Sequence, residues 1–464
     1  MRRIVAVFVL FACLQHAYAG FSVGFAREDV TPAPGIPMVG SFNPKPAQGT
    51  QDPLYLDCIA VSDGKRTALI FSSDELQPSP QFRNPMMKVL MKETGVPRDL
   101  IFYHATHTHT SVMSWPWSRM APDVTKRVRD HAERRIRAFA EVGKRAMKDL
   151  RPARIFTATA RCPDVSFIRR YRMKDGSVVT NPGMDNPKVA HALGEADDMV
   201  RVVRFMRKGA PDVAIVNFGT HPNTVSAQKY SADWPGVVRQ TFENGIGGGV
   251  KCLFLNAAQG DVNHFCQKPT QAWWAMRRRG DTTKHIGRAV ASAAMTVWDV
   301  CDEVKSGEIF GAIRNVRVPT HRASADELRW VRLYDEGRRR EIPLNDFDLK
   351  LITGKNSRVR NDKNLPPYCW IPVSYLKLGP DIVFAGFACE PFVSIGRKIK
   401  EESPFAVTVL SCLTNGGCGY LASTESYAEG GYEIITSIYG AEAGDLVIKG
   451  VLNHLKELKK ENRK

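Results

Sequence analysis

Two histidines separated by one residue, His107 and His109, stand shortly after the apolar run 100–103. In an extended chain, residues i and i+2 point to the same side, so both imidazole rings can face one point. Imidazole is a preferred ligand of zinc, and a catalytic zinc site combines several protein ligands with one open position. The spacing therefore predicts a metal site at the end of a strand, to which other segments supply the remaining ligands.

Four further apolar runs are followed by polar residues in the same way. We expect strands at 212–218, 251–255, 381–387 and 405–410, and behind them stand His221, Asp261, Glu390 and Tyr420 respectively. In α/β sheets, ligands collect outside the carboxyl ends of the strands. The sequence therefore predicts that five loops meet and that their polar side chains share one site.

The remaining pattern predicts the elements that carry these loops. Short β-branched runs indicate strands, and apolar residues at helical spacing indicate helices. We also expect a strand at 67–72, helices at 81–94, 123–149, 274–298 and 444–458, and a helical excursion with a loop at 322–366. The intervals vary too much for a regular parallel barrel. We therefore predict one large α/β domain of mixed β-sheets flanked by helices, with the metal site at the C-terminal ends of strands.

Composition narrows the class of partner. The 464 residues are 43% hydrophobic and 24% charged, with a formal net charge of +17. Such a charge favours contact with an anionic membrane surface or acidic substrates, or it belongs to an Arg-rich solvated surface. No basic repeat is interleaved with aromatic residues, so we expect no nucleic-acid partner. Past residue 19 stand nine cysteines without a Cys-x-x-Cys pair, which predicts buried thiols and one or two disulfides at most.

Residues 1–19 have the pattern of a signal peptide. A basic start precedes an apolar run at 4–14 that is too short to span a bilayer, and Ala17-Tyr18-Ala19 has the form of a cleavage site. We expect export to the periplasm or the medium and a soluble mature chain that starts at residue 20. The alternative, a lipoprotein modified at Cys13, fits less well because its apolar run would be short.

Four motifs in a fixed order carry a resemblance to a known family. They are His-Thr-His at 107–109, Gly-Thr-His-Pro at 219–222, Gln-Gly-Asp-Val at 259–262, and the pair Tyr420 and Tyr432. In this order they resemble the neutral/alkaline (non-lysosomal) ceramidase family, zinc-dependent amidases that cleave the N-acyl bond of ceramide. The resemblance implies that residues 20–464 form the family's N-terminal catalytic domain. We expect no counterpart of its C-terminal β-sandwich domain.

The resemblance also implies a role for individual residues. By it, His107, His221, Glu390 and Tyr420 would bind zinc, and His109, Arg169 and Tyr432 would contact the substrate. Arg170 is an equal candidate for the role of Arg169. The sequence departs from the family after the first motif, at Thr110-Ser111-Val112, and after the third, at Asn263-His264. These departures leave zinc amidase chemistry in place but open the choice between ceramide and another N-acyl amide.

The function implied is an exported zinc-dependent amidase of the N-acylsphingosine amidohydrolase class, which hydrolyses ceramide or a related N-acyl lipid. Asp261 would orient a ligand imidazole or brace a loop, and Trp115 and Trp117 would wall an acyl site or simply pack. Two alternatives remain. One is a barrel-type metallo-dependent hydrolase on another substrate, and the other is a non-catalytic exported binding protein on the same scaffold. Metal analysis followed by an amide hydrolysis assay separates all three.

Overall fold

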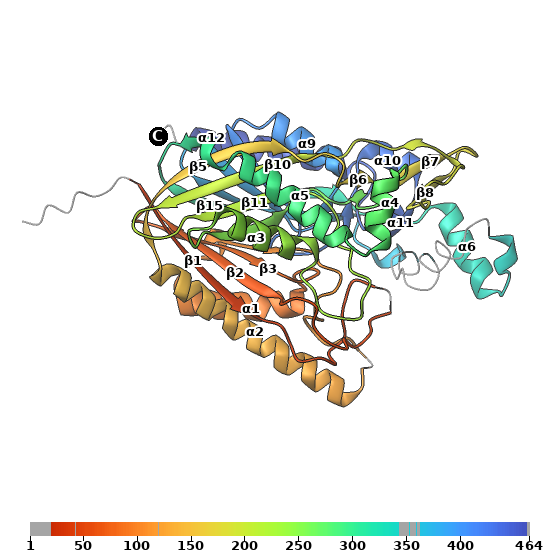
Figure 1. Cartoon of the computed structure of the whole chain (residues 1–464). Coiled ribbons are helices and arrows are strands. Elements are labelled where there is room, and N and C mark those ends of the chain that lie inside the picture. Colours follow the sequence, from red (N-terminus) through yellow and green to blue (C-terminus); the bar gives the residue numbers. More distant parts are fainter. Residues whose placement is uncertain are drawn as a thin grey trace, which may run out of the picture.

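The computed structural model describes residues 20–461 apart from 42, 119, 343–351, 353–358 and 360–361. The predicted signal segment, and part of the predicted excursion at 322–366, therefore lie outside the described residues. Within them the chain has the expected mixed α/β fold, in which two large β-sheets pack between helices (Figure 1).

The first sheet has nine strands in the order β12-β11-β10-β5-β1-β2-β3-β4, with β14 paired to β5. Their bounds are β1 (Phe21–Asp29), β2 (Tyr55–Ser62), β3 (Thr67–Ser73), β4 (Ile101–Ala105), β5 (Arg151–Arg161), β10 (Met199–Arg207), β11 (Val213–Phe218), β12 (Lys251–Asn256) and β14 (Asp302–Val304). The pairs β3/β4 and β11/β12 are parallel, and the longer strands between them are antiparallel. The four parallel strands thus direct their carboxyl ends toward loops that can share a site.

The second sheet has four strands in the order β15-β16-β17-β19. They are β15 (Ile309–Pro319), β16 (Tyr368–Leu378), β17 (Ile382–Phe387) and β19 (Val407–Ser411). The smaller pairings join β13 (Val262–Asn263) to β6 (Phe167–Ile168), β18 (Glu390–Pro391) to β20 (Tyr420–Leu421), and β7 (Arg170–Met173) to β8 (Val178–Thr180) and β9 (Val189–Ala192). Because β17 and β19 are parallel, their following loops also lie at one end.

Helices cover the outer faces of both sheets. Those that pack on the sheets are α1 (Pro80–Thr94), α2 (Pro122–Lys148), α3 (Asp233–Ile246), α5 (Thr282–Thr296), α9 (Val393–Glu401) and α12 (Ala443–Lys460). The other helices of the described residues are α4 (Gln271–Arg278), α6 (Ala325–Asp335), α10 (Thr424–Glu429), α11 (Tyr432–Thr436), η1 (Arg98–Leu100), η2 (Trp298–Val300), η3 (Arg339–Glu341) and η5 (Asp362–Asn364). Apolar clusters place α1 and α2 on the β1–β4 part of the first sheet, α3 and α5 on β10–β12, and α9 and α12 on the second sheet.

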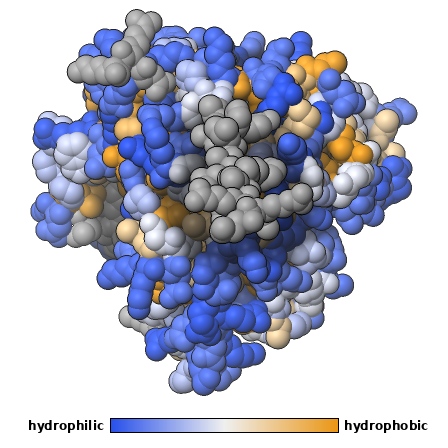
Figure 2. All heavy atoms as spheres, turned by 90° about the vertical axis from the view of Figure 1, so that its left-hand side faces the viewer, coloured by the Kyte–Doolittle hydropathy of each residue, from blue (hydrophilic) through white to orange (hydrophobic). Residues whose placement is uncertain are grey.

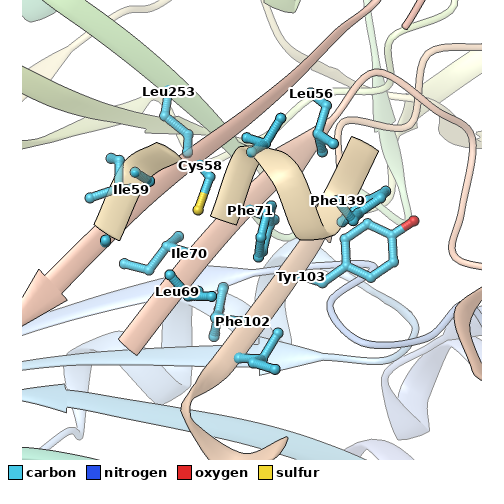
Figure 3. Packing of buried hydrophobic residues seen from close by; sticks show 14 of the residues in the cluster. Leu56, Cys58, Ile59, Leu69, Ile70, Phe71, Phe102, Tyr103, Phe139 and Leu253 are labelled. Atoms are coloured by element: carbon cyan, nitrogen blue, oxygen red, sulfur yellow. The ribbon is translucent and has the colours of Figure 1, made fainter. Parts of the chain in front are cut away.

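The largest apolar cluster fills the space between the sheets and continues under α2 (Figure 3). Phe102 of β4 contacts Phe384 of β17 with ring centroids 6.0 Å apart, and Phe71 of β3 meets Phe139 of α2 at 5.2 Å. The first sheet also curls, since the Ser72 hydroxyl of β3 donates to the Phe254 carbonyl of β12 at 2.7 Å. The curl brings β4 and β12, the first and last strands of the sheet order, close to each other.

Most predicted elements are confirmed, with small shifts at their ends. The predicted helix 274–298 is wrong in one respect: it is two helices, α4 and α5, separated at Gly280, whose φ of +73° a glycine adopts without strain. All nine cysteines between 58 and 418 are free thiols, five of them buried, so the expected buried thiols are present and the one or two disulfides that the sequence allowed are not. In the described part of the chain, no helix combines the length and apolarity needed to cross a membrane. Hydrophilic side chains cover most of the face shown in Figure 2.

Candidate metal centre

Three histidine rings meet where the first sheet's parallel strands end. His107 and His109 follow β4, and His221 follows β11. One ring nitrogen of each lies within 4.8 Å of the others, so the three could hold a metal ion. The Nε2 atoms of His107 and His221 are 3.0 Å apart, and those of His107 and His109 are 3.3 Å apart. The predicted convergence of the loops is therefore present, with His109 inside the cluster beside the two predicted ligands.

The backbone brings these rings together by a different route from the one predicted. Strand β4 ends at Ala105, and His107 has a φ of +72°, so the extended geometry expected for the His-x-His pair is wrong. A non-glycine residue in this region costs about 1–3 kcal/mol and persists only where its surroundings fix it. Here the His107 amide donates to the Glu75 carbonyl at 2.9 Å, and its Nδ1 lies 2.7 Å from the Leu76 carbonyl.

The loop at Gly40 fixes the ring of His109. The Nδ1 of His109 lies 2.7 Å from the Gly40 carbonyl. A Cβ atom added at Gly40 would stand 2.6 Å from the His109 Cα, so this position requires a glycine. Gly40 has a φ of +100°, which also favours glycine.

The proton positions show that the cluster suits a cation. A carbonyl only accepts hydrogen bonds, so the Nδ1 atoms of His107 and His109 must carry the protons. Burial and the neighbouring His107 lower the pKa of His109 to about 3, which keeps it neutral at pH 7. The Nε2 atoms of His107 and His109, 3.3 Å apart, point toward each other on the side away from these carbonyls. Buried imidazole nitrogens that converge in this way are typical of a metal site.

Glu390 adds an anionic oxygen to the cluster. It is the first residue of β18, which pairs in parallel with β20 and so places Glu390 opposite Tyr420. Its Oε2 lies 3.2 Å from the His107 Nε2 and 3.9 Å from the His221 Nε2, and it is buried without a hydrogen-bond partner. A buried carboxylate oxygen without a donor is costly unless a cation compensates it. The donor set thus fits a metal ion.

Arg169, rather than Arg170, lies beside the histidines. Its Nη1 is 3.4 Å from the His221 Nδ1, and Glu433 holds its Nε at 2.7 Å. Burial opposes its charge, but Tyr420 and Glu433 more than compensate and raise the pKa of Arg169. Arg170 instead donates to the Ser426 hydroxyl at 2.8 Å and to the Gly430 carbonyl at 2.8 Å.

The two predicted tyrosines form one aromatic pair. Tyr420 and Tyr432 have ring centroids 5.6 Å apart, and the guanidinium carbon of Arg169 lies 5.1 Å and 5.9 Å from their rings. Burial raises the pKa of Tyr420, and the carboxylate of Glu390 raises it further. Without a cation, Tyr420 therefore stays a neutral phenol at pH 7.

Asp261 braces a loop. Its Oδ1 accepts the Val393 amide at 2.8 Å at the start of α9, and its carbonyl accepts the Arg169 amide at 2.9 Å.

Two glutamates that support the site, Glu75 and Glu433, were not predicted from the sequence. Glu75 holds the backbone of His107, and Glu433 holds the side chain of Arg169. The signal for Glu75 was available, because Asp74-Glu75 follows the predicted strand 67–72 as the other site residues follow theirs.

A cavity of about 810 Å³ opens in front of the cluster. His107, His109, Glu390, Tyr420 and Tyr432 reach its wall. The predicted aromatic pair lines it as well: Trp115 is half-buried, and Trp117 is 54% exposed. The cavity therefore combines polar groups at its base with an aromatic rim.

Comparison with known proteins identifies the fold. No protein-family model matches the chain. No curated protein matches its sequence. Among solved structures, neutral ceramidase from Pseudomonas aeruginosa aligns with a TM-score of 0.68 at 16% identity, over 96% of this chain and 75% of that chain. A ceramidase complexed with C2 gives the same score and identity over 96% of this chain and 76% of that chain. At this identity the likeness shows a shared fold.

Proposed function

We propose that this chain is a zinc-dependent amidase that hydrolyses an N-acyl amide of a lipid, ceramide or a relative of it. The observation that carries the proposal is the convergence of ring nitrogens from His107, His109 and His221 beside the unpartnered oxygen of Glu390. The likeness to ceramidase structures supports this reaction class, and the aromatic rim of the cavity supports an apolar acyl group. The mixed sheets give no support to the barrel-type alternative.

We assign zinc binding to His107, His221, Glu390 and Tyr420. A bound zinc ion would polarise the amide carbonyl and supply an activated water at neutral pH. The chain's own residues then do the rest. Arg169 and Tyr432, beside Tyr420, donate hydrogen bonds to the negative charge that develops on the carbonyl oxygen. The Nε2 of His109, which Gly40 holds in place through Nδ1, would take a proton from the attacking water and pass it to the leaving amine.

Arg169 is already positioned and charged before the reaction begins. It lies against His221 and both tyrosines, and Glu433 fixes its direction. A guanidinium stays protonated at any working pH, so this donor is available without proton uptake. The second candidate function, a non-catalytic binding protein, would retain the fold but would have no need of four converging donors.

The decisive test joins metal analysis to turnover. We expect about one zinc per chain by elemental analysis, and release of free acid from a panel of ceramides and N-acyl amino acids followed by mass spectrometry. His107→Ala should lose zinc and turnover, while His109→Ala should keep zinc and lose turnover by roughly 10²–10⁴. Absence of zinc after the metal is supplied would exclude the proposal, and zinc without turnover would favour the binding protein. Export, expected from residues 1–19, is tested separately by the N-terminus of the purified chain.

A further inference from the structure

A second concave surface lies between α1 and the middle of β15 and β16. It encloses about 470 Å³, and none of its lining residues belongs to the cavity in front of the histidines. We call it the basic groove and define it by its cations, Arg83, Lys88 and Arg98, and its apolar floor, Met87, Ile313 and Pro372. No acidic side chain lines it.

The cations of the basic groove lack carboxylate partners. Arg83 donates to the Asn415 carbonyl at 2.7 Å, and Arg98 donates to the Ile101 carbonyl at 3.3 Å. Within the described ranges, neither arginine nor Lys88 has a carboxylate in salt-bridge range. Burial, together with Arg83, lowers the pKa of Arg98 to about 10. A half-buried charge without a counter-ion is costly, so an anion bound in the groove would compensate both guanidiniums.

A strip of apolar side chains on β16, bordered by polar residues of β15 and with Arg317 stacked on Tyr368 at its far end, leads away from these cations. In the β15/β16 register, Ile313 faces Ser374, Asn315 faces Pro372, Arg317 faces Trp370 and Pro319 faces Tyr368. Paired residues share one face of the sheet, so Trp370 and Tyr368 continue the floor of the groove. They are 60% and 48% exposed. From Ser374 to Tyr368 the strand advances roughly 20 Å, the length of an extended long acyl chain.

We propose that the basic groove and this strip bind a free long-chain fatty acid. Its carboxylate would pair with Arg98, because a guanidinium matches a carboxylate with two parallel hydrogen bonds, and Lys88 and Arg83 would add their positive charge. Its chain would lie along Ile313, Pro372 and Trp370. The strip is one strand pair wide, which suits a single acyl chain. The basic groove is concave, which suits the carboxylate end of one molecule. The site requires no reaction, so it is independent of the proposed amide hydrolysis.

A fluorescent fatty acid provides the probe. We expect cis-parinaric acid, used below its micelle concentration with the full chain, to bind saturably and to be displaced by palmitate but not by methyl palmitate. Lys88→Gln/Arg98→Gln should weaken binding at least tenfold, and Ile313→Asp should do the same. Arg201→Gln is the control for the cations, because Arg201 is also half-buried and burial lowers its pKa as well. Leu446→Asp is the control for Ile313→Asp, because Leu446 is 39% exposed and Ile313 is 36% exposed. Neither control should change the affinity.

Three outcomes would overturn the proposal. One is equal affinity in Lys88→Gln/Arg98→Gln and Arg201→Gln. The second is loss of binding in His107→Ala, which would place the fatty acid in the catalytic cavity. The third is co-sedimentation with phosphatidylglycerol vesicles that depends on Arg98 without binding of the monomeric acid, which would assign the surface to a bilayer. If Ile313→Asp loses its circular dichroism signal, the double variant decides alone.

Discussion

The histidines of β4 and of the loop that follows it differ in what their second ring nitrogen contacts. His104 of β4 has both nitrogens in hydrogen bonds, with Nδ1 2.9 Å from the Cys412 carbonyl and Nε2 accepting the Asn256 amide at 3.0 Å. Burial lowers the pKa of His104 to about 3, so it stays a neutral structural link. His107 and His109 also fix Nδ1 on a carbonyl, but they direct Nε2 at each other. The Nε2 of His104 is thus occupied by a hydrogen bond, whereas those of His107 and His109 belong to the candidate metal cluster.

Substitution of each tyrosine should distinguish the metal ligand from the oxyanion donor. A ligand holds the metal in every state, whereas an oxyanion donor meets charge that exists mainly in the transition state. Tyr432→Phe should therefore keep zinc and KM while kcat falls by about 10²–10³. Tyr420→Phe should weaken zinc retention, although His107, His221 and Glu390 still hold the ion. The measurement is zinc stoichiometry beside kcat for each variant. Zinc loss in Tyr432→Phe together with full zinc and activity in Tyr420→Phe would reverse the assignment.

The strands bring the side chains of the site close together, but the loops fix the positions of the individual rings. Gly40→Ala would place a Cβ atom 2.6 Å from the His109 Cα, so the ring must move. We expect the variant to fold and to lose at least tenfold in kcat, because a displacement near 1 Å at a reacting group is costly. Gly64→Ala is the control: Gly64 also has a positive φ, +86°, but open space around it. Equal activity of the two variants would show that Gly40 does not position His109.

Helix α2 supports the strained turn through a buried ion pair. The Arg135 Nη2 lies 2.9 Å from the Glu75 Oε1, which also accepts the Tyr103 hydroxyl, while the Glu75 carbonyl holds His107. Arg135→Leu leaves the carboxylate buried without its cation and should cost about 3–5 kcal/mol in the free energy of unfolding. Lys126→Ala, which breaks an exposed pair with Asp130 on the same helix, should leave the urea midpoint unchanged. A similar small effect in both would mean that Glu75 needs no partner.

The sequence predicts the short apolar strands and their convergence, but not the strands that separate them. β5 mixes apolar residues with Arg and Thr, and β15 mixes them with Arg and Asn, because one face of each strand is exposed along much of its length. Their partners are distant in sequence, so no local pattern marks them. The pattern of apolar runs singled out His107, His109, His221, Asp261, Glu390 and Tyr420, since each follows such a run, whereas Arg169 and Tyr432 came from the family resemblance alone. The positive φ of His107 was not predictable, because it depends on carbonyls of the Glu75-Leu76 loop.

A buried lysine far from the site makes the stability of the whole molecule depend on pH. Lys400 of α9 pairs with Asp197, but burial and Arg201 outweigh this pairing and lower the pKa of Lys400 from 10.5 to about 8. Between these values the unfolded chain binds the proton and the folded chain does not, so the lysine makes stability rise with pH. The difference amounts to about 3 kcal/mol. Urea unfolding at pH 7.5 and 10.5 should show this rise in the parent chain relative to Lys400→Met. A parallel pH dependence in both proteins would contradict it.

The proposed metal would join the two sheets. His107 and His221 follow strands of the first sheet, while Glu390 and Tyr420 follow strands of the second. An ion held by all four binds only the folded chain, so it stabilises that state by RT ln(1 + [L]/Kd), about 4 kcal/mol at a thousandfold excess over Kd. Removing the ion with a chelator should therefore lower Tm by several degrees, and added zinc should restore it. His107→Ala should start at the lower Tm and ignore the chelator. An equal drop in that variant would locate the stabilising metal elsewhere, and an unchanged Tm in the parent chain would mean that no ion joins the sheets.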